Sequence, residues 1–427
     1  MNNAMTVSAL RSDGQPSQDV SAAPPSPRPC QRAAEASSPG QRTVVLYAGQ
    51  YCIEPWVHQQ ALGHERYRCH VAATQYVNRD AFPNERVHLI EDENRLVGWW
   101  HRLLCGAETF RRPTAHRTRM WRFMKILKET DADLIHAHFL WNDLAARVAE
   151  EWRGPLVVTA HGTDVNAART NEHYREKVQQ VFAVARRIIA VSDFVAAKLA
   201  EVGCPREKIV RIPLGVSLPP VCADVARAEG RTNIVCIASL RAVKGHKYLL
   251  EAFAEAARHE PRLFLTLVGE GKLRGEIEAQ SRGLGIEKRV RLTGWVPPRK
   301  VREILKTSHI YAQHSIGVTV EEKGGPSLHE EGLGLSLVEA ASFGLPLVAT
   351  RSGGIPEICR DGENGLLVDE RDTAGMAEKL VQLARDPQLR STLGARGRAI
   401  VEREFDLRKQ LGALEDLYDD VLAEAAQ

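Results

Sequence analysis

The chain has 427 residues, and at about 150 residues per domain this length predicts two domains with additional segments. It is 44% hydrophobic, 26% charged and 6% aromatic, which excludes collagen-like, fully disordered and disulfide-scaffold proteins. Because 57 Lys and Arg oppose 54 Asp and Glu, the net charge of +3 gives no overall field for wrapping nucleic acid, and no nucleic-acid partner is expected.

The cysteines and the N-terminal residues indicate the cellular compartment of the protein. The eight cysteines lie far apart, without a CxxC pair or a zinc-ligand spacing, which favours a reducing setting. No apolar run reaches the roughly 18 residues of a membrane span, and the N-terminus lacks the features of a secretory signal. We therefore expect a cytoplasmic protein.

The first half of the chain alternates short apolar runs with amphipathic stretches. Residues 1–41 are rich in Pro, Ser and Ala without an apolar period, so we expect a disordered tail there. The βαβ order that follows predicts a parallel sheet. The expected strands are 43–48, 70–73, 134–138, 156–160, 188–191 and 209–212. The expected helices are 140–152, 174–186 and 193–202.

A second βαβ series follows a proline-rich break, in which we expect a linker at 218–230. Its expected strands are 234–238, 263–268, 290–293, 310–312, 346–349 and 365–368. We predict an α/β protein with two doubly wound Rossmann-like domains, 42–217 and 231–406, that face one another across a cleft. Residues 407–427 are expected to form a helix that packs back on the first domain. Ligands of such sheets bind beyond the carboxyl ends of the strands, so the cleft is the expected site.

Two cations and a glycine turn follow the first strands of the second series. Arg241 and Lys244, in the segment SLRAVKG, could clamp a diphosphate, and a solvated basic turn is the alternative. Gly269, in VGEG, would let backbone approach a ligand closely. The spacing of these glycines does not complete a dinucleotide fingerprint, so a plain strand-to-helix turn remains open.

A pair of glutamates eight residues apart brackets a glycine-rich turn. In the segment EGLGLSLVE, Glu331 precedes the turn and Glu339 falls two turns into a predicted helix. Free backbone N–H groups at the start of that helix could face phosphate oxygens. An acidic solvated face is the ordinary explanation of such a pair.

Several of these residues converge on one edge. HGTD (161–164) follows a strand of the first half and SGGIPE (352–357) a strand of the second. The residues that follow strands, and are expected to face one crevice, are Gly49, His161, Arg241, Gly269, Glu331 and Gly353.

The order HGTD, SLRxxKG, VGEG, the glutamate pair and SGGIPE resembles the GT-B family of retaining glycosyltransferases that use nucleotide sugars, the glycosyl transferases group 1 with the Glu-x7-Glu motif. The resemblance extends over nearly all of the expected folded chain. Residues 54–60, 136–139, Asp193 and 203–209 are similar to the bacterial branch that builds exopolysaccharides of the colanic acid and amylovoran kind.

The resemblance implies roles on the donor side. Arg241 and Lys244 would hold the donor diphosphate, Glu339 the ribose, and Glu331 the transferred sugar. The remaining donor contacts would come from Gly269 and from the turn residues Gly332, Leu333, Gly334 and Leu335. The nucleotide sugar is then a co-substrate, and neither a metal nor another cofactor is expected.

The resemblance also implies roles on the acceptor side. His161 would sit beside the reacting centre, and Asp164 would help to shape the acceptor side as the third residue of a catalytic group with Glu331. Gly49 and Glu54 would face the acceptor, a saccharide or lipid-linked saccharide. Front-side attack would demand no protein nucleophile, unlike the two-carboxylate scheme of many glycosidases.

Two departures from the family pattern stand out. The glycine-rich loop that many relatives have after the first strand is reduced to Gly49, Gln50 and Tyr51. The insert 317–330 lengthens the approach to Glu331 and is interpreted as a mobile flap or an acceptor contact.

A basic and aromatic stretch lies at 98–128, with eight Lys or Arg against one Glu. It suits an anionic membrane surface, so we expect peripheral contact with the inner face of the cytoplasmic membrane, and a solvated helix with buried tryptophans is the alternative. Asp131 and Asp133 mimic a metal-binding DxD motif but precede a strand, on the edge away from the cleft. His136 and His138 share a strand face without a third ligand, so a metal site is not expected there either.

These patterns predict a hexosyltransferase of surface-glycan biosynthesis. A nucleotide-sugar epimerase of the same fold and a non-catalytic saccharide- or nucleotide-binding module are the alternatives. The binding module would need none of the phosphate-clamping groups, and the motif order is that of the transferases.

Overall fold

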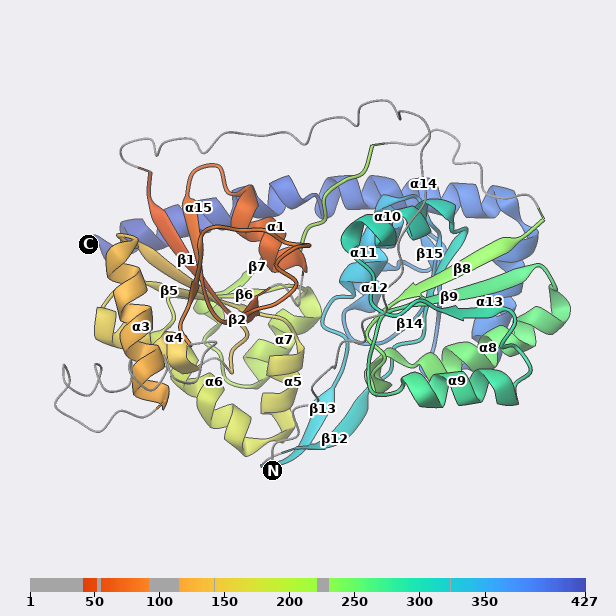
Figure 1. Ribbon diagram of the computed structural model, residues 1–427, viewed down its shortest axis with the longest axis horizontal. Coiled ribbons are helices and arrows are strands. Elements are labelled where there is room, and N and C mark those ends of the chain that lie inside the picture. Colours follow the sequence, from red (N-terminus) through yellow and green to blue (C-terminus); the bar gives the residue numbers. More distant parts are fainter. Residues whose placement is uncertain (1–40, 52–54, 92–114, 142, 221–229, 323) are drawn as a thin grey trace, which may run out of the picture. The chain divides into compact units, whose positions relative to one another are not determined.

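The computed structural model describes residues 41–51, 55–91, 115–141, 143–220, 230–322 and 324–427. Two parallel sheets with helices on both of their faces make up this part of the chain (Figure 1). The tail expected at 1–41 falls almost wholly outside the described residues, and so does most of the expected linker.

The first sheet has seven strands in the order β3-β2-β1-β4-β5-β6-β7, and every neighbouring pair is parallel. The strands are β1 (Thr43–Tyr51), β2 (Arg68–Tyr76), β3 (Val87–Leu89), β4 (Leu134–His138), β5 (Leu156–Ala160), β6 (Arg187–Ala190) and β7 (Ile209–Arg211). All residues of β4 and β5 are buried, because helices cover both faces of the sheet. The helices are α1 (Pro55–Gly63), α3 (Ala115–Glu129), α4 (Asp143–Trp152), α5 (Thr163–Thr170), α6 (Glu172–Val184) and α7 (Asp193–Glu201).

The second sheet has six parallel strands in the order β10-β9-β8-β11-β14-β15. They are β8 (Thr232–Ile237), β9 (Leu263–Val268), β10 (Val290–Leu292), β11 (Ile310–Gln313), β14 (Leu347–Thr350) and β15 (Gly365–Val368). The helices are α8 (His246–His259), α9 (Arg274–Gly283), α10 (Pro298–Thr307), α11 (Leu335–Ser342), α12 (Ile355–Ile358), α13 (Thr373–Arg385) and α14 (Pro387–Glu404). The predicted α/β class with two doubly wound sheets is confirmed, and several strands match their predicted limits to the residue.

The insert 317–330 folds as an antiparallel hairpin. Its strands are β12 (Val318–Glu322) and β13 (Gly325–His329), paired with Thr319 opposite Leu328. Gly324 and Gly325 have φ values of 94° and 119°, a backbone region that favours glycine. Neither strand was predicted from the sequence, because polar residues and a proline interrupt the apolar alternation that marks a strand.

The C-terminal helix α15 (Leu407–Ala425) lies against the first sheet and against α1 (Figure 1). The Glu415 carboxylate accepts hydrogen bonds from the backbone N–H groups of Glu65 at 2.8 Å and Arg66 at 2.9 Å. Arg66 also donates to Asp419 at 2.6 Å. The Tyr418 hydroxyl contacts His136 Nδ1 of β4 at 2.5 Å, so this helix reaches the central strands of the sheet.

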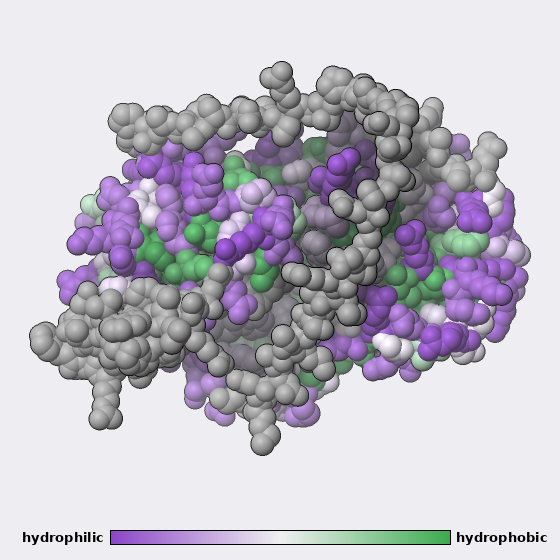
Figure 2. All heavy atoms as spheres, in the orientation of Figure 1, coloured by the Kyte–Doolittle hydropathy of each residue, from purple (hydrophilic) through white to green (hydrophobic). Residues whose placement is uncertain are grey.

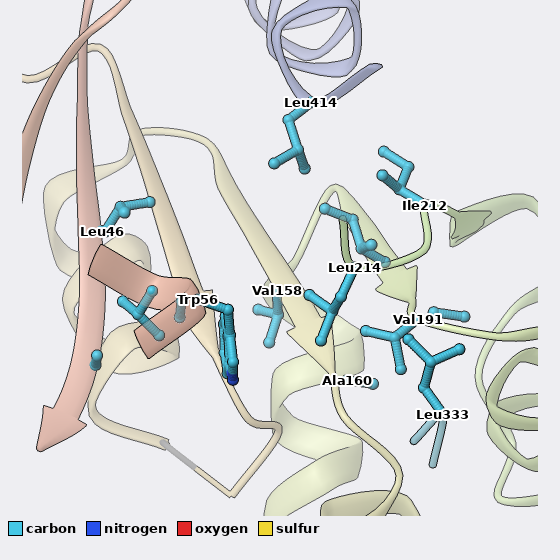
Figure 3. Close-up of a cluster of buried hydrophobic side chains, with 14 of the residues drawn as sticks. Leu46, Trp56, Val158, Ala160, Val191, Ile212, Leu214, Leu333 and Leu414 are labelled. Atoms are coloured by element: carbon cyan, nitrogen blue, oxygen red, sulfur yellow. The ribbon is translucent and has the colours of Figure 1, made fainter. Parts of the chain in front are cut away.

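The apolar core at the carboxyl ends of the first sheet includes Leu333 from the second half of the chain. Leu333 is 4% exposed and belongs to the same buried cluster as Val191 and Leu214. Figure 3 shows its side chain pointing toward Val191, with Trp56 and Val158 further along the same layer. The loop before α11 is therefore anchored in the core of the first sheet.

Polar side chains dominate the outer helices on the face shown in Figure 2. Among the described residues, the large apolar side chains that are most exposed are Leu62 at 55%, Trp295 at 50% and Val320 at 39%. Within the same ranges, no helix is both long and apolar enough to cross a membrane.

Candidate active site

Three glycine turns from distant parts of the sequence pack backbone against backbone. A β-carbon on Gly332 would lie 2.1 Å from the carbonyl oxygen of His161, and one on Gly354 would lie 2.2 Å from the carbonyl oxygen of Gly332. Gly162 has a φ of 100°, and a β-carbon there would lie 2.6 Å from the Cα of Gly332. The Ser192 hydroxyl donates to the carbonyl of Gly332 at 2.7 Å. The motifs HGTD, EGLG and SGGIPE therefore meet in one place.

Lys244 and Glu331 form the charged centre of this place. Lys244 Nζ lies 2.6 Å from Glu331 Oε2, and their side chains are 21% and 11% exposed. The same oxygen accepts from Gln313 Nε2 and from Ser315 Oγ, each at 3.2 Å. A carboxylate with three donors on one oxygen is held in a single orientation.

A buried network of polar side chains holds the two residues that donate to Glu331, Gln313 and Ser315. The Tyr311 hydroxyl donates to Gln313 Oε1 at 2.7 Å and contacts Ser336 Oγ at 2.8 Å, while Gln313 Nε2 also donates to Ser315 at 2.7 Å. Tyr311, Gln313 and Ser315 lie on or just after β11, so the central strand of the second sheet orients Glu331. Sequence reasoning missed these residues, because a polar side chain at the end of a short apolar strand gives no distinctive pattern.

Helix α11 begins at Leu335, and its N-cap residue Gly334, whose φ is 92°, has no side chain to cap the first turn. Its first backbone N–H groups therefore remain available to an anion, as the sequence predicts for this turn. Glu339 lies half-buried in the second turn of this helix. The side chain of Leu333 points into the core, so only the backbone of that residue could reach a donor.

His161 lies in an aromatic setting at the end of β5. Its ring centroid is 4.4 Å from that of Trp56 and 4.5 Å from that of Phe139, and its Nε2 is 3.3 Å from His138 Nδ1. Burial, and to a smaller extent His138, lower the pKa of His161 well below its usual value. The imidazole is therefore neutral at neutral pH, and one of the two facing nitrogens carries the hydrogen.

Asp164 is fully buried, and its carboxylate accepts hydrogen bonds from backbone N–H groups. Its Oδ1 accepts from the N–H groups of His161 and Gly162 at 3.0 Å and of Val165 at 3.1 Å, and its Oδ2 accepts from Leu140 at 2.9 Å. The sequence-based assignment of Asp164 to the catalytic group is therefore corrected to a positioning role, because a 0% exposed carboxylate cannot contact a substrate. It fastens the turn that carries His161 to the end of β4.

Arg241 is exposed, and its guanidinium meets the hairpin β12–β13. Its Nη2 lies 3.4 Å from His329 Nδ1, while His329 Nε2 lies 3.2 Å from Glu322 Oε1. His329 is 7% exposed. Sequence reasoning did not single out His329, although its place two residues before Glu331 was a usable signal.

An aromatic row leads away from His161 on the first half of the chain. Phe139 and Trp141 stack with ring centroids 5.2 Å apart and planes at 5°, and Trp141 lies 6.1 Å from Tyr174. Phe139 has a φ of 67°, a costly conformation for a bulky residue that its surroundings must impose. All three rings are partly exposed.

Two predicted ligand-facing glycines have other partners. Gly49 lies within β1 and not in a loop after it, because Gln50 and Tyr51 continue the pairing with β2, and its carbonyl accepts the Thr74 hydroxyl. Gly269 donates its N–H to Gly294 at 3.0 Å, and a β-carbon there would lie 2.1 Å from the carbonyl of Ala238. Close packing accounts for Gly269, and Glu54 lies outside the described residues.

The aspartate pair before β4 and the histidine pair within it, where no metal site is expected, have structural explanations. Asp133 accepts the Thr43 N–H at 2.6 Å and Asp131 has a φ of 48°, so both belong to the turn before β4. Rings of His136 and His138 lie 4.8 Å apart on one face, as predicted. Across the described ranges, no group of three or more His, Cys, Asp or Glu side chains is placed to hold a metal ion.

The basic stretch 98–128 is described only from residue 115 onward. In α3, Phe123 is fully buried, Arg122 is 8% exposed, and Arg119 pairs with Glu91. Arg122 was expected on a membrane-facing surface, and this expectation is wrong because its side chain packs inside the domain.

Comparison with known proteins adds to this geometry. Residues 60–218 match Glycosyltransferase Family 4, and residues 223–400 match Glycosyl transferases group 1. A putative colanic acid biosynthesis glycosyltransferase of Salmonella typhimurium is 25% identical over 329 residues, 71% of this chain and 79% of that protein. The D-inositol 3-phosphate glycosyltransferase of Saccharomonospora viridis is 30% identical over 319 residues, 68% of this chain and 70% of that protein. The crystal structure of Anabaena HepE in complex with UDP-glucose has a TM-score of 0.72 at 18% identity, covering 88% of this chain and 99% of that one.

Proposed function

Because the chain belongs to the glycosyl transferases group 1 family and is a glycosyltransferase of the GT-B type, we propose that it moves a hexosyl unit from a UDP- or GDP-linked sugar to a saccharide or lipid-linked saccharide. The anomeric configuration is retained in this proposal. The observation that carries it is the Lys244–Glu331 pair at 2.6 Å beside an uncapped helix start, since such a site offers both signs of charge to one elongated ligand.

The donor lies along the carboxyl ends of the second sheet. Lys244 and Arg241 neutralise its diphosphate, and the first N–H groups of α11 donate to phosphate oxygens. Binding the diphosphate competes with Glu331 for the Lys244 ammonium, so Glu331 is freed to accept from hydroxyls of the transferred sugar. Glu339, two turns into α11, accepts from the ribose.

The transfer step needs no protein nucleophile. The bond from the anomeric carbon to the diphosphate breaks while a bond to the acceptor oxygen forms on the same face, and the leaving diphosphate takes the acceptor proton. Catalysis then rests on orientation and on stabilising the departing charge. A neutral His161 suits this scheme, because it can donate to or accept from a sugar hydroxyl without adding a charge.

The aromatic row supports a saccharide as the acceptor. Flat, partly exposed rings at Phe139, Trp141 and Tyr174 offer faces on which the C–H side of a pyranose can lie, and the row begins at His161. The colanic acid relative, at 25% identity, favours exopolysaccharide biosynthesis as the setting.

A cytoplasmic location with peripheral membrane contact belongs to the same proposal. The exposed cations of α3 that remain for an anionic surface include Lys125, whose side chain is 54% exposed. Flotation with anionic vesicles tests this contact: reversal of charge at Lys125 and Lys128 should reduce it, and equal flotation of the variant and the wild-type protein contradicts it.

The experiment for the function is incubation of the purified protein with UDP- and GDP-hexoses and a panel of saccharide acceptors, followed by NMR of the product. We expect a glycoside with the anomeric configuration of the donor. Inversion of that configuration contradicts the proposed mechanism, epimerisation of the donor without transfer indicates the epimerase, and binding without turnover of any acceptor indicates the binding module.

A substitution in the aromatic row tests its assignment to the acceptor. Trp141→Ala should raise the acceptor KM about 5- to 30-fold and leave the donor KM unchanged, because one lost stacking contact is worth about 1–2 kcal/mol. Trp295→Ala is the matched control, since Trp295 is 50% exposed and lies three residues after β10 in the other half of the chain. Equal acceptor KM values for the two variants would remove the row from the site.

A further inference from the structure

The hairpin β12–β13 joins the two halves of the chain beside the donor site. At its base, Glu370 accepts the N–H of Gly317 with both carboxylate oxygens at 3.0 Å, and Arg371 donates to the carbonyl of Gly317 at 3.2 Å. This end is therefore fixed to the second half, next to β15.

The far end of the hairpin is seated on the first half, where α5 ends and α6 begins. Asn171 Nδ2 donates to the carbonyl of Gly325 at 3.1 Å, and the N–H of Leu328 donates to Thr170 Oγ1 at 3.0 Å. Glu330, directly after β13, pairs with Arg169 of α5 at 2.9 Å. The hairpin is thus held by both halves and is fixed relative to the loops that carry His161 and Glu331.

The hydrogen bonds of His329 determine its tautomer. A guanidinium has only donors, so Arg241 donates and His329 Nδ1 accepts at 3.4 Å. The hydrogen must then be on Nε2, which donates to Glu322 Oε1 at 3.2 Å. A connected path of polar contacts therefore runs from Glu322 through His329 to Arg241.

We propose that His329 is a positioning residue that aims the Arg241 guanidinium at the donor diphosphate, with Glu322 fixing the tautomer that allows it. This inference rests on the proposed function, because it takes Arg241 as a diphosphate ligand. Arg241 is a long, exposed side chain that loses rotamer freedom when it binds, and a partner that holds it in place beforehand reduces that loss. His329 is 7% exposed and does not need to touch the donor for this effect.

The prediction concerns binding of phosphate groups only. His329→Ala should raise the donor KM and the dissociation constant of the nucleoside diphosphate about 5- to 10-fold, the range of one ordinary hydrogen bond. The affinity for the corresponding nucleoside, which has no phosphate, should stay unchanged, and so should kcat. His329→Asn should restore most of the affinity, because the Asn side-chain oxygen can replace Nδ1 as the acceptor.

The experiment is a double-mutant cycle of His329→Ala and Arg241→Ala, measured by calorimetry with UDP and GDP, whichever binds the wild-type protein, and with uridine or guanosine. In the Arg241→Ala background, His329→Ala should have no further effect on the diphosphate. The control is His259→Ala, a side chain 61% exposed at the end of α8.

The outcomes separate the inference from the function on which it rests. If His329→Ala weakens diphosphate binding as much in the Arg241→Ala background as in the wild-type protein, the positioning role is overturned. It is also overturned if His329→Ala weakens binding of the nucleoside as much as binding of the diphosphate. Unchanged diphosphate affinity in Arg241→Ala alone would remove that residue from the donor site and overturn the donor assignment. If His329→Ala does not fold, Glu322→Ala takes its place in the cycle, with a smaller loss expected in the same direction.

Discussion

Gly332 sits where two halves of the chain touch through their backbones, and no side chain fits between them. A β-carbon at this position would lie 2.1 Å from the carbonyl oxygen of His161, and that oxygen belongs to backbone, which cannot turn aside as a flexible side chain would. A larger residue must therefore push the donor loop away from His161.

The first prediction is that Gly332→Ala lowers kcat/KM about 100-fold, since a displacement of about 1 Å in a reacting pair costs that much. Steady-state transfer assays check it. Gly275→Ala in α9 is the matched control: nothing lies within 4 Å of its β-carbon, so this change should leave activity intact and raise stability by about 0.5–1 kcal/mol. Equal activity of the two variants would contradict the close approach.

Asp164 shows why a residue in a functional motif can be structural. Its carboxylate satisfies four backbone N–H groups that would otherwise be buried without partners. The sequence motif HGTD is compatible with a catalytic and with a structural aspartate, and only the fold distinguishes the two.

The second prediction is that Asp164→Ala destabilises the protein by about 2–4 kcal/mol, because it leaves buried donors unpaired. Chemical denaturation measures this loss. Asp193→Asn should cost less than about 0.5 kcal/mol, since the Asp193 side chain is 73% exposed. A loss of activity in Asp164→Ala without a loss of stability would return this residue to the catalytic group.

At the scale of elements, the sequence predicts the parallel strands better than the links between them. Strands such as β4 and β5 are short, mostly apolar runs buried on both faces, so they can be recognised from the sequence. Because parallel strands end at one edge, the positions of His161 and Lys244 follow from β5 and β8, which precede them.

The hairpin β12–β13 and the short helix α5 could not be predicted in the same way. The residues of β12 are mostly exposed, and the buried residues of β13 lie where that strand packs against α5. Helix α5 has eight residues, too few to display a clear helical period. The partners of Arg241 and His161, which are His329 and His138, depend on tertiary contacts that no local pattern encodes.

Helix α15 is fastened to the first sheet by a charge that should make its docking sensitive to acid. Burial alone would raise the pKa of Glu415, but hydrogen bonds from His64, Arg66 and backbone N–H groups outweigh it and lower that pKa to about 2. A depressed carboxyl pKa contributes stability that is complete above the unfolded value, about 4.5, and is lost as the pH falls toward 2.

The third prediction is that Glu415→Gln destabilises the protein by about 1–3 kcal/mol at pH 7, and that this difference shrinks as the pH falls from about 4.5 toward 2. Denaturation at a series of pH values checks both parts. Asp416→Asn, at a neighbouring side chain that is 74% exposed, should change stability little. A Glu415→Gln difference that does not depend on pH would contradict the role assigned to this charge.

For the whole molecule, the two halves share side chains as well as backbone contacts. Glu357, in the motif SGGIPE of the second half, accepts the N–H groups of Asp193 at 2.9 Å and Phe194 at 2.8 Å, so it stabilises the start of α7 in the first half. With the Ser192 contact to Gly332 and the hairpin, this places the donor loop and His161 in one connected site.

The central claim is that Lys244 and Glu331 form the centre of a nucleotide-sugar site, and calorimetric titration of UDP, GDP and ADP into the wild-type protein, Lys244→Ala and Lys247→Ala tests it most directly. Lys247 is an exposed lysine three residues away, so its loss should leave affinity unchanged. We expect one of these nucleoside diphosphates to bind the wild-type protein and Lys247→Ala with equal affinity. Lys244→Ala should bind it at least about 10-fold more weakly, because a charge-assisted contact is lost. Equal affinity of Lys244→Ala and Lys247→Ala would contradict the claim.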